Sequence, residues 1–140
     1  LIDKNNNEIK EVENNQTIGV EINYNINKKK LIIPAVNVYN NFDEILFSSI
    51  DRDIDAAKKR DVGSYKCKLW FPCYLFSEGI FSAIVTLFTP SPVRSERIIE
   101  TDKVLRFRVH DDKLKNIIGI LNPNAPTSLR PKFNWTYEKT

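Results

Sequence analysis

Apolar and polar residues alternate with a period of two along most of this chain, and this alternation limits the fold more than any other feature. In residues 20–27, valine, isoleucine and tyrosine occupy every second position, with glutamate and asparagine between them. Successive side chains of a strand point to opposite faces, so the pattern predicts a strand with one buried and one solvated face. Six further strands are predicted at residues 31–39, 42–50, 63–71, 81–87, 105–109 and 133–137.

Turn residues separate these segments, and together they predict the fold class. Asn40-Asn41 predicts a short hairpin, and Pro72 ends or kinks the strand before it. The charged residues 51–61 are interpreted as a loop or a short helix. About seven short strands, without a dominant stretch of helical periodicity, predict an all-β, antiparallel sandwich of immunoglobulin-like or jelly-roll type.

Length and composition predict one folded core. The chain has 140 residues, of which 41% are hydrophobic and 28% charged, as in ordinary globular domains. Residues 1–16 are rich in asparagine and are interpreted as a polar lead-in or linker, with one edge strand around Ile9 to Val12, so the sandwich is predicted at residues 17–140. The absence of methionine and of a signal-peptide pattern leads us to expect a fragment of a longer protein.

Charge and cysteine content argue against several classes of protein. The net charge is +3, and the two basic runs, residues 28–30 and 58–60, fall in predicted turns without interleaved aromatic residues, so no nucleic-acid surface is predicted. Cys67 and Cys73 are too far apart along an extended strand for a disulfide, which predicts two free thiols in a reducing compartment.

The usual catalytic patterns are nearly missing. His110 is the one histidine, no cysteine or histidine lies near it at zinc-ligand spacing, and the four glycines are too scattered to form a phosphate-binding loop. One catalytic alternative remains: a glycosidase, in which two of the 18 acidic residues would meet in a cleft. We therefore expect a binding protein that is not an enzyme and uses no metal or cofactor.

The candidate site is made of the side chains at the polar, outward-facing positions of the predicted strands. These side chains combine amide, basic and aromatic groups, which suit sugars because aromatic rings accept pyranose C–H groups while amides and guanidinium groups bond the hydroxyls. There are two alternatives to a sugar site. In the first, the polar face is a plain hydrated surface in the folded protein; in the second, residues 51–61 or a partner subunit cover the tryptophan. The predicted carbohydrate-binding residues are Trp70, Tyr39, Asn37, Arg106 and Arg108.

Several short motifs resemble one family over residues 17–137. A Gly-x-aromatic element precedes an apolar strand, and a later strand carries an Asp-led pattern that ends in Phe-x-Val. The residues that carry these motifs are Leu75-Phe76, Gly79-Ile80-Phe81, Phe107-Arg108-Val109, Asn40-Asn41-Phe42-Asp43 and Arg130-Pro131-Lys132-Phe133-Asn134-Trp135. In these residues the chain resembles the C-terminal domain of Wzt, the nucleotide-binding subunit of ABC transporters that export O-antigen polysaccharide.

The resemblance implies a fold, a function and a set of partners. It implies an immunoglobulin-like sandwich that recognises lipid-linked O-antigen polysaccharide in the cytoplasm, at the inner membrane, before export. It also implies an ATP-binding domain upstream, a transporter membrane subunit as partner, and a homodimer that exchanges the closing strand with Phe133 and Trp135. The alternative is a protein-interaction module of the same sandwich class without a sugar site.

Overall fold

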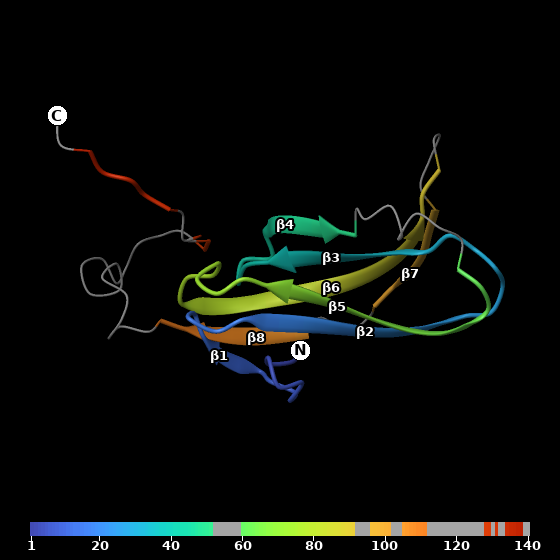
Figure 1. The fold of residues 1–140 in the computed structure, drawn as a ribbon, viewed down its shortest axis with the longest axis horizontal. Helices are drawn as coiled ribbons and strands as arrows, with labels where there is room; N and C mark the ends of the chain where they lie inside the picture. Colours follow the sequence, from blue (N-terminus) through green and yellow to red (C-terminus); the bar gives the residue numbers. More distant parts are fainter. Residues whose placement is uncertain are drawn as a thin grey trace.

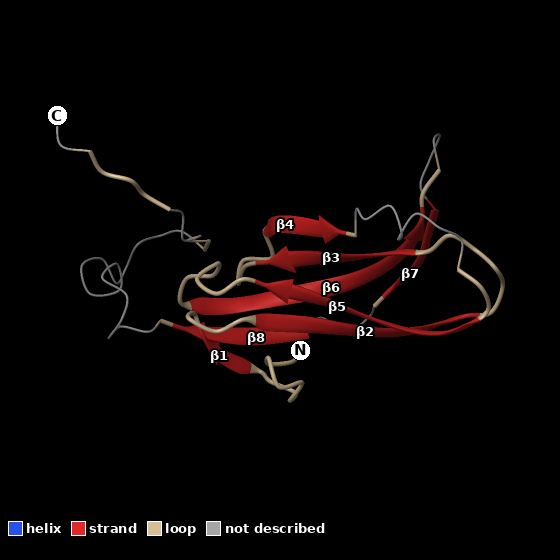
Figure 2. Cartoon of the chain, viewed as in Figure 1, coloured by secondary structure: helices blue, strands red, loops and turns tan. Residues whose placement is uncertain are grey.

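The fold is a sandwich of two β-sheets (Figure 1). The computed structural model describes residues 1–51, 60–91, 96–101, 105–111, 128–129, 131 and 134–138, and Figure 2 shows strands and loops but no helix among them. The strands are β1 (Glu11–Glu13), β2 (Ile18–Ile26), β3 (Ile33–Tyr39), β4 (Ile45–Ile50), β5 (Gly63–Phe71), β6 (Gly79–Thr89), β7 (Glu96–Glu100) and β8 (Leu105–His110).

The two sheets differ in size. The large sheet has the order β1-β8-β6-β3-β4, with β7 also paired to β6, and the small sheet consists of β2 and β5. All pairings between these strands are antiparallel except that of β1 with β8, which is parallel. The predicted all-β, antiparallel sandwich is confirmed, with a parallel edge strand that the sequence pattern did not indicate.

Burial follows the predicted parity of the strands. Val20 on β2 and Val38 on β3 are both fully buried, whereas Glu21, Asn37 and Tyr39 beside them are half-buried. On β5 the polar side chains of one parity are exposed, and the other parity ends at buried Phe71. The apolar faces of both sheets therefore enclose one core.

A cluster of aromatic rings fills one end of this core. Phe76, in the loop after β5, lies 4.8 Å from Phe81 and 5.5 Å from both Phe71 and Phe107, measured between ring centroids. These residues come from both sheets, and each is 3% exposed. Tilted and edge-to-face ring contacts of this kind add to the burial of apolar area, so the cluster fixes the two sheets relative to each other at this end.

The predicted lead-in packs against both sheets. Ile2 is buried and exchanges two backbone hydrogen bonds with Gly19 on β2, at 2.9 and 2.8 Å. Further along, Glu11–Glu13 forms β1, which confirms the predicted edge strand, and buried Val12 aligns with Val109 of β8. This part of residues 1–16 therefore belongs to the folded sandwich, and its role as a linker stays a prediction.

The structure differs from the sequence prediction at two places, and a third predicted feature lies mostly outside the described residues. β7 was missed because its two adjacent isoleucines lie between charged residues and do not alternate. The closing segment was predicted as a strand, but its described part, residues 134–138, forms no strand, and Phe133 lies outside the described residues. Most of the predicted loop or helix at 51–61 also lies outside them.

Candidate functional site

Four of the five predicted site residues lie on the outer face of the large sheet. Asn37 and Tyr39 belong to β3, Arg106 and Arg108 belong to β8, and β6 runs between these two strands. Each alternates with residues buried in the core, so its side chain points to the solvent side of the sheet. The arginines are exposed and the β3 residues are half-buried.

The register places one row of side chains directly across three strands. Tyr39 on β3 aligns with Ser82 on β6, and Ser82 aligns with Arg106 on β8. Neighbouring strands lie about 4.8 Å apart, so this row spans roughly 10 Å. A phenol, a hydroxyl and a guanidinium group therefore share one line on the sheet surface.

A hollow of about 400 Å³ adjoins this row. Its polar groups include carboxamides, a carboxylate, a hydroxyl and a guanidinium group, which together offer both donors and acceptors of hydrogen bonds. Sugar hydroxyl groups need both kinds of partner. The hollow is lined by Asn40, Asn41, Asp43, Ile80, Phe81, Ser82 and Arg106.

The β3–β4 hairpin that forms one wall of the hollow is held by Asn40. The side-chain Oδ1 of Asn40 accepts hydrogen bonds from the backbone N–H groups of Phe42 and Glu44, at 2.9 and 3.0 Å. Its Nδ2 donates to the Glu44 carboxylate at 2.7 Å. Asp43 has a φ of 59°, a left-handed conformation that aspartate tolerates in turns. Asn40 was recognised in the sequence as a turn residue but not as part of the site.

Charged and polar neighbours border the face. The hydroxyl of Ser48 on β4 donates to Oδ1 of Asn37 at 2.6 Å. Glu11 on β1 aligns with Arg108, and its carboxylate lies 3.1 Å from Nε2 of His110. The single histidine is therefore an exposed group at the end of β8, within hydrogen-bond distance of the Glu11 carboxylate on the edge strand β1.

Trp70 lies on the other sheet. It belongs to β5, which pairs with β2, and its parity directs it away from the core on the opposite side of the sandwich. The prediction that all five residues share one face is therefore wrong at this residue. Strand parity distinguishes inward from outward side chains, but it does not tell which sheet a strand joins. A role in sugar binding stays a prediction for all five residues.

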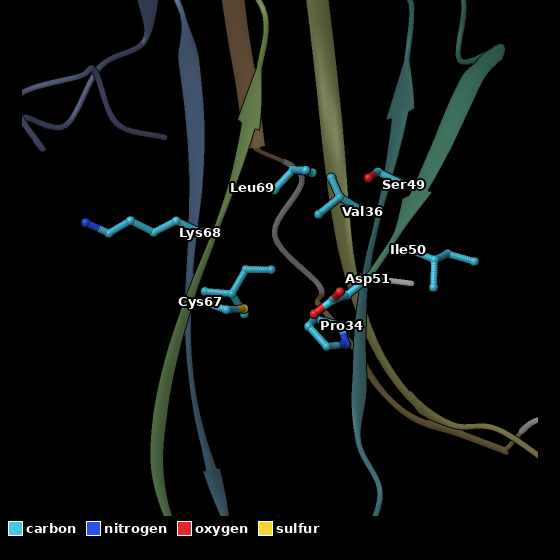
Figure 3. Close-up of a pocket in the computed structure, with 9 residues that line it drawn as sticks. Pro34, Val36, Ser49, Ile50, Asp51, Cys67, Lys68 and Leu69 are labelled. Carbon is cyan, nitrogen blue, oxygen red and sulfur yellow. The ribbon is translucent and has the colours of Figure 1, made fainter. Parts of the chain in front are cut away.

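A cavity of about 310 Å³ lies between the two sheets on the side of β4 and β5 (Figure 3). Figure 3 shows the Asp51 carboxylate directed between the sheets, whereas Lys68 points away. Burial raises the pKa of the Cys67 thiol in this wall. Much of the remaining lining is apolar, including Val36 and Leu69. The hydroxyl groups of a sugar would lose water here and gain few hydrogen-bond partners, which is unfavourable. The cavity is therefore a weaker candidate for a sugar site than the open face.

The described residues contain neither a metal-binding cluster nor a membrane-spanning helix. No group of three or more histidine, cysteine, aspartate or glutamate side chains there is arranged to hold a metal ion. The described part of the chain also contains no helix long and apolar enough to cross a membrane. The expectation that the chain is not an enzyme stays a prediction.

Comparison with solved structures identifies the fold. No family model matches the chain, and no curated protein matches it. A crystal structure of the C-terminal domain of Wzt matches with a TM-score of 0.71 over 97% of this chain and 78% of that chain. The chain has the fold of the Wzt C-terminal domain. The resemblance predicted from the motifs is thus confirmed for the fold. Since the sequence identity is 9%, the roles of individual residues rest on the geometry of this chain.

Proposed function

We propose that this chain recognises a polysaccharide, without catalysis, through the outer face of the large sheet. The observation that carries the proposal is the row of Tyr39, Ser82 and Arg106 beside a polar hollow of about 400 Å³. Carbohydrate sites combine an aromatic surface with fixed donors and acceptors, and this face supplies both.

Each group on the face has a distinct part in this proposal. The half-buried ring of Tyr39 contacts the C–H groups of a pyranose, and the guanidinium groups of Arg106 and Arg108 donate to hydroxyl or acidic oxygens. Asn37 already accepts from Ser48, so its Nδ2 is the group that donates to the sugar. A neutral hydrogen bond contributes about 0.5–1.5 kcal/mol net and a charge-assisted one more, so three or four contacts contribute about 4 kcal/mol, which corresponds to roughly millimolar affinity.

The polysaccharide that we propose is the lipid-linked O-antigen chain of an ABC exporter. The fold shared with the Wzt C-terminal domain supports this context, as do the motifs around Gly79 and Phe107. In this arrangement the domain lies in the cytoplasm, at the inner membrane. Its partners are an upstream ATP-binding domain and the membrane subunit of the transporter.

We also propose that the chain forms a homodimer through its C-terminal segment. Ser128 accepts a backbone hydrogen bond from Ser77 at 3.0 Å, which attaches the chain near the aromatic cluster before the closing segment begins. Trp135 and Tyr137 are 78% and 88% exposed, and residues 134–138 lie away from both sheets (Figure 1). An unpaired aromatic segment gains burial by adding to the small sheet of a second copy. Sedimentation at tens of micromolar should give a dimer, and a monomer would contradict the exchange.

Calorimetric titration with purified O-polysaccharide tests the sugar site. Arg106→Ala should lower the affinity at least tenfold without lowering the melting temperature, because the side chain is exposed. The matched control is Arg97→Ala on β7, an exposed arginine that forms an ion pair with Glu100. Equal affinities for wild type and Arg106→Ala would refute the site, and no binding of any glycan by the wild type would refute the function.

One observation favours the alternative of a protein-interaction module. β5 pairs along one side with β2, and no described strand pairs with its other side, which lies next to the cavity between the sheets. Such an edge accepts an added strand from a partner protein. Binding of a peptide to this edge, with no binding of glycans, would support that alternative.

A further inference from the structure

We propose that Trp70 forms a second sugar-binding platform, on the small sheet and separate from the Arg106 hollow. The inference rests on the proposed function, because it assumes that the chain binds glycans. It adds that one chain contacts the polymer on two opposite faces of the sandwich. The argument depends on how the indole ring is held and on which groups surround it.

Gly19 on β2 makes room for the indole ring. The register aligns Gly19 with Trp70 across the small sheet. A Cβ atom placed on Gly19 would lie 2.7 Å from Cζ3 and 2.9 Å from Cε3 of Trp70, so the six-membered ring lies directly over the glycine. Ile2 borders the same position, since its Cγ1 would lie 2.8 Å from that Cβ. The ring is thus supported from below and at one edge, which reduces the entropy lost when a ligand stacks on it.

Despite this support, Trp70 remains 40% exposed. A tryptophan that only filled the gap above a glycine would be expected to bury more of its area, because burying an aromatic ring is favourable. The exposed part of a fixed indole is a flat, electron-rich surface. The C–H groups of a pyranose ring are its natural partner among the components of a glycan.

The outer face beyond Trp70 carries ordered polar groups. On the next pair along the strands, Glu21 lies 3.4 Å from Nζ of Lys68 and 3.3 Å from Nζ of Lys66. Asn23 donates to the same carboxylate at 3.1 Å. Lys68 also donates to Oδ1 of Asn6. An ammonium group has three donor hydrogens, so each lysine still keeps at least one for a sugar hydroxyl while Glu21 holds it in position.

A hollow of about 390 Å³ continues this face toward the far end of the two strands. Asn23, Asn25, Ser64 and Lys66 supply its polar lining, and the Ser64 hydroxyl donates to Asn25 at 2.7 Å. Trp70 lies six residues along β5 from Ser64, a distance of about 20 Å in an extended strand. The outer face of the small sheet between Trp70 and Ser64 is therefore long enough for an oligosaccharide, with the indole at one end. The ligand class that fits it is a chain of hydroxylated pyranoses.

Two faces that bind the same repeating polymer have a consequence for affinity. When one face is bound, the second binding event on that polymer becomes intramolecular, provided that the chain is long enough to reach it. A single repeat unit cannot bridge the two faces. The long polymer should therefore bind more tightly than the repeat unit, and loss of either face should remove this advantage.

Tryptophan fluorescence tests the proposal directly, because the chain has two tryptophans, Trp70 and Trp135. In Trp135→Phe the emission comes from Trp70 alone. Titration with the purified O-polysaccharide and with its single repeat unit should change this emission in a saturable way. The change should persist in Trp135→Phe/Arg106→Ala, because the two faces are separate.

Two substitutions at Trp70 separate binding from packing. Trp70→Leu keeps an apolar cover over Gly19 but removes the aromatic surface, whereas Trp70→Ala removes both. Both should weaken binding of the polymer at least fivefold, and Trp70→Leu should melt within a few degrees of the wild type. Two results would overturn the second platform alone. In the first, calorimetry shows glycan binding but the Trp70 emission does not change; in the second, Trp70→Leu binds the polymer with full affinity. Absence of all glycan binding would overturn the proposed function with it.

Discussion

Replacing Asn40 tests whether one side chain organises the wall of the candidate site. Asn40 is 8% exposed and makes three side-chain hydrogen bonds, two from backbone N–H groups and one to the Glu44 carboxylate. In Asn40→Ala all three are lost. At about 1 kcal/mol for each bond, and little more for the charged one because Glu44 is exposed, the loss is about 3 kcal/mol. For a domain of this size that lowers the melting temperature by about 10 °C.

Asn40→Asp separates the acceptor role of the side chain from its donor role. Aspartate keeps the oxygen that accepts from Phe42 and Glu44, but it replaces Nδ2 with a carboxylate oxygen 2.7 Å from the Glu44 carboxylate. Two carboxylates this close share a proton at higher pH than either would alone, so the pKa of one of them is raised. The variant should therefore be destabilised at pH 7 and recover stability, relative to Asn40→Ala, as the pH falls toward 5.

Thermal denaturation followed by circular dichroism at pH 7 and pH 5 measures these effects. Asn41→Ala is the matched control, because Asn41 is exposed in the same hairpin and also lines the hollow. It should change the melting temperature by less than about 2 °C. An Asn40→Ala variant that melts with the wild type, or an Asn40→Asp variant without pH dependence, would refute the role given to Asn40.

Three further predictions concern other parts of the sandwich. The Tyr24 hydroxyl is buried without a hydrogen-bond partner among the described residues, and burial raises its pKa, so Tyr24→Phe should leave stability unchanged or raise it by about 1 kcal/mol in chemical denaturation. Thiol labelling of the folded chain should be fast at exposed Cys73 and slow at half-buried Cys67, and equal rates would count against the packing of β5. Hydrogen bonds from Asn23, Lys66 and Lys68 lower the pKa of Glu21 below its ordinary 4.5, so its stabilising effect is present above that pH and is lost as the pH falls through the lowered value. Glu21→Gln should accordingly be less stable than the wild type at pH 7, and denaturation curves of the two should converge in acid.

The strands that alternate cleanly were predictable from the sequence. In β2, β5 and β8 each apolar residue of one parity packs into the shared core, so local pattern and tertiary structure agree. β7 has no such alternation, because Ile99 is an exposed residue on a strand that pairs with part of β6. The parallel pairing of β1 with β8 joins residues nearly one hundred positions apart, and no local pattern encodes such a contact.

The candidate site was predictable in part for the same reason. Parity correctly directed Asn37, Tyr39, Arg106 and Arg108 to the solvent side, since each lies between core residues. The separation of Trp70 from them depends on which strands pair, and pairing is decided by the whole core. Only the register shows that Tyr39 and Arg106 share a row through Ser82.

The most direct test of the sugar site is an NMR titration of the ¹⁵N-labelled chain with purified O-polysaccharide, read residue by residue. Binding at the outer face of the large sheet should shift the amide signals of residues 37–43, 80–84 and 106–110 together, and a second group around Gly19 and Trp70 should shift if the small sheet also binds. The signals of buried Val20 should change little. Shifts confined to the β5 edge and the cavity between the sheets, or no shifts at millimolar glycan, would contradict the account.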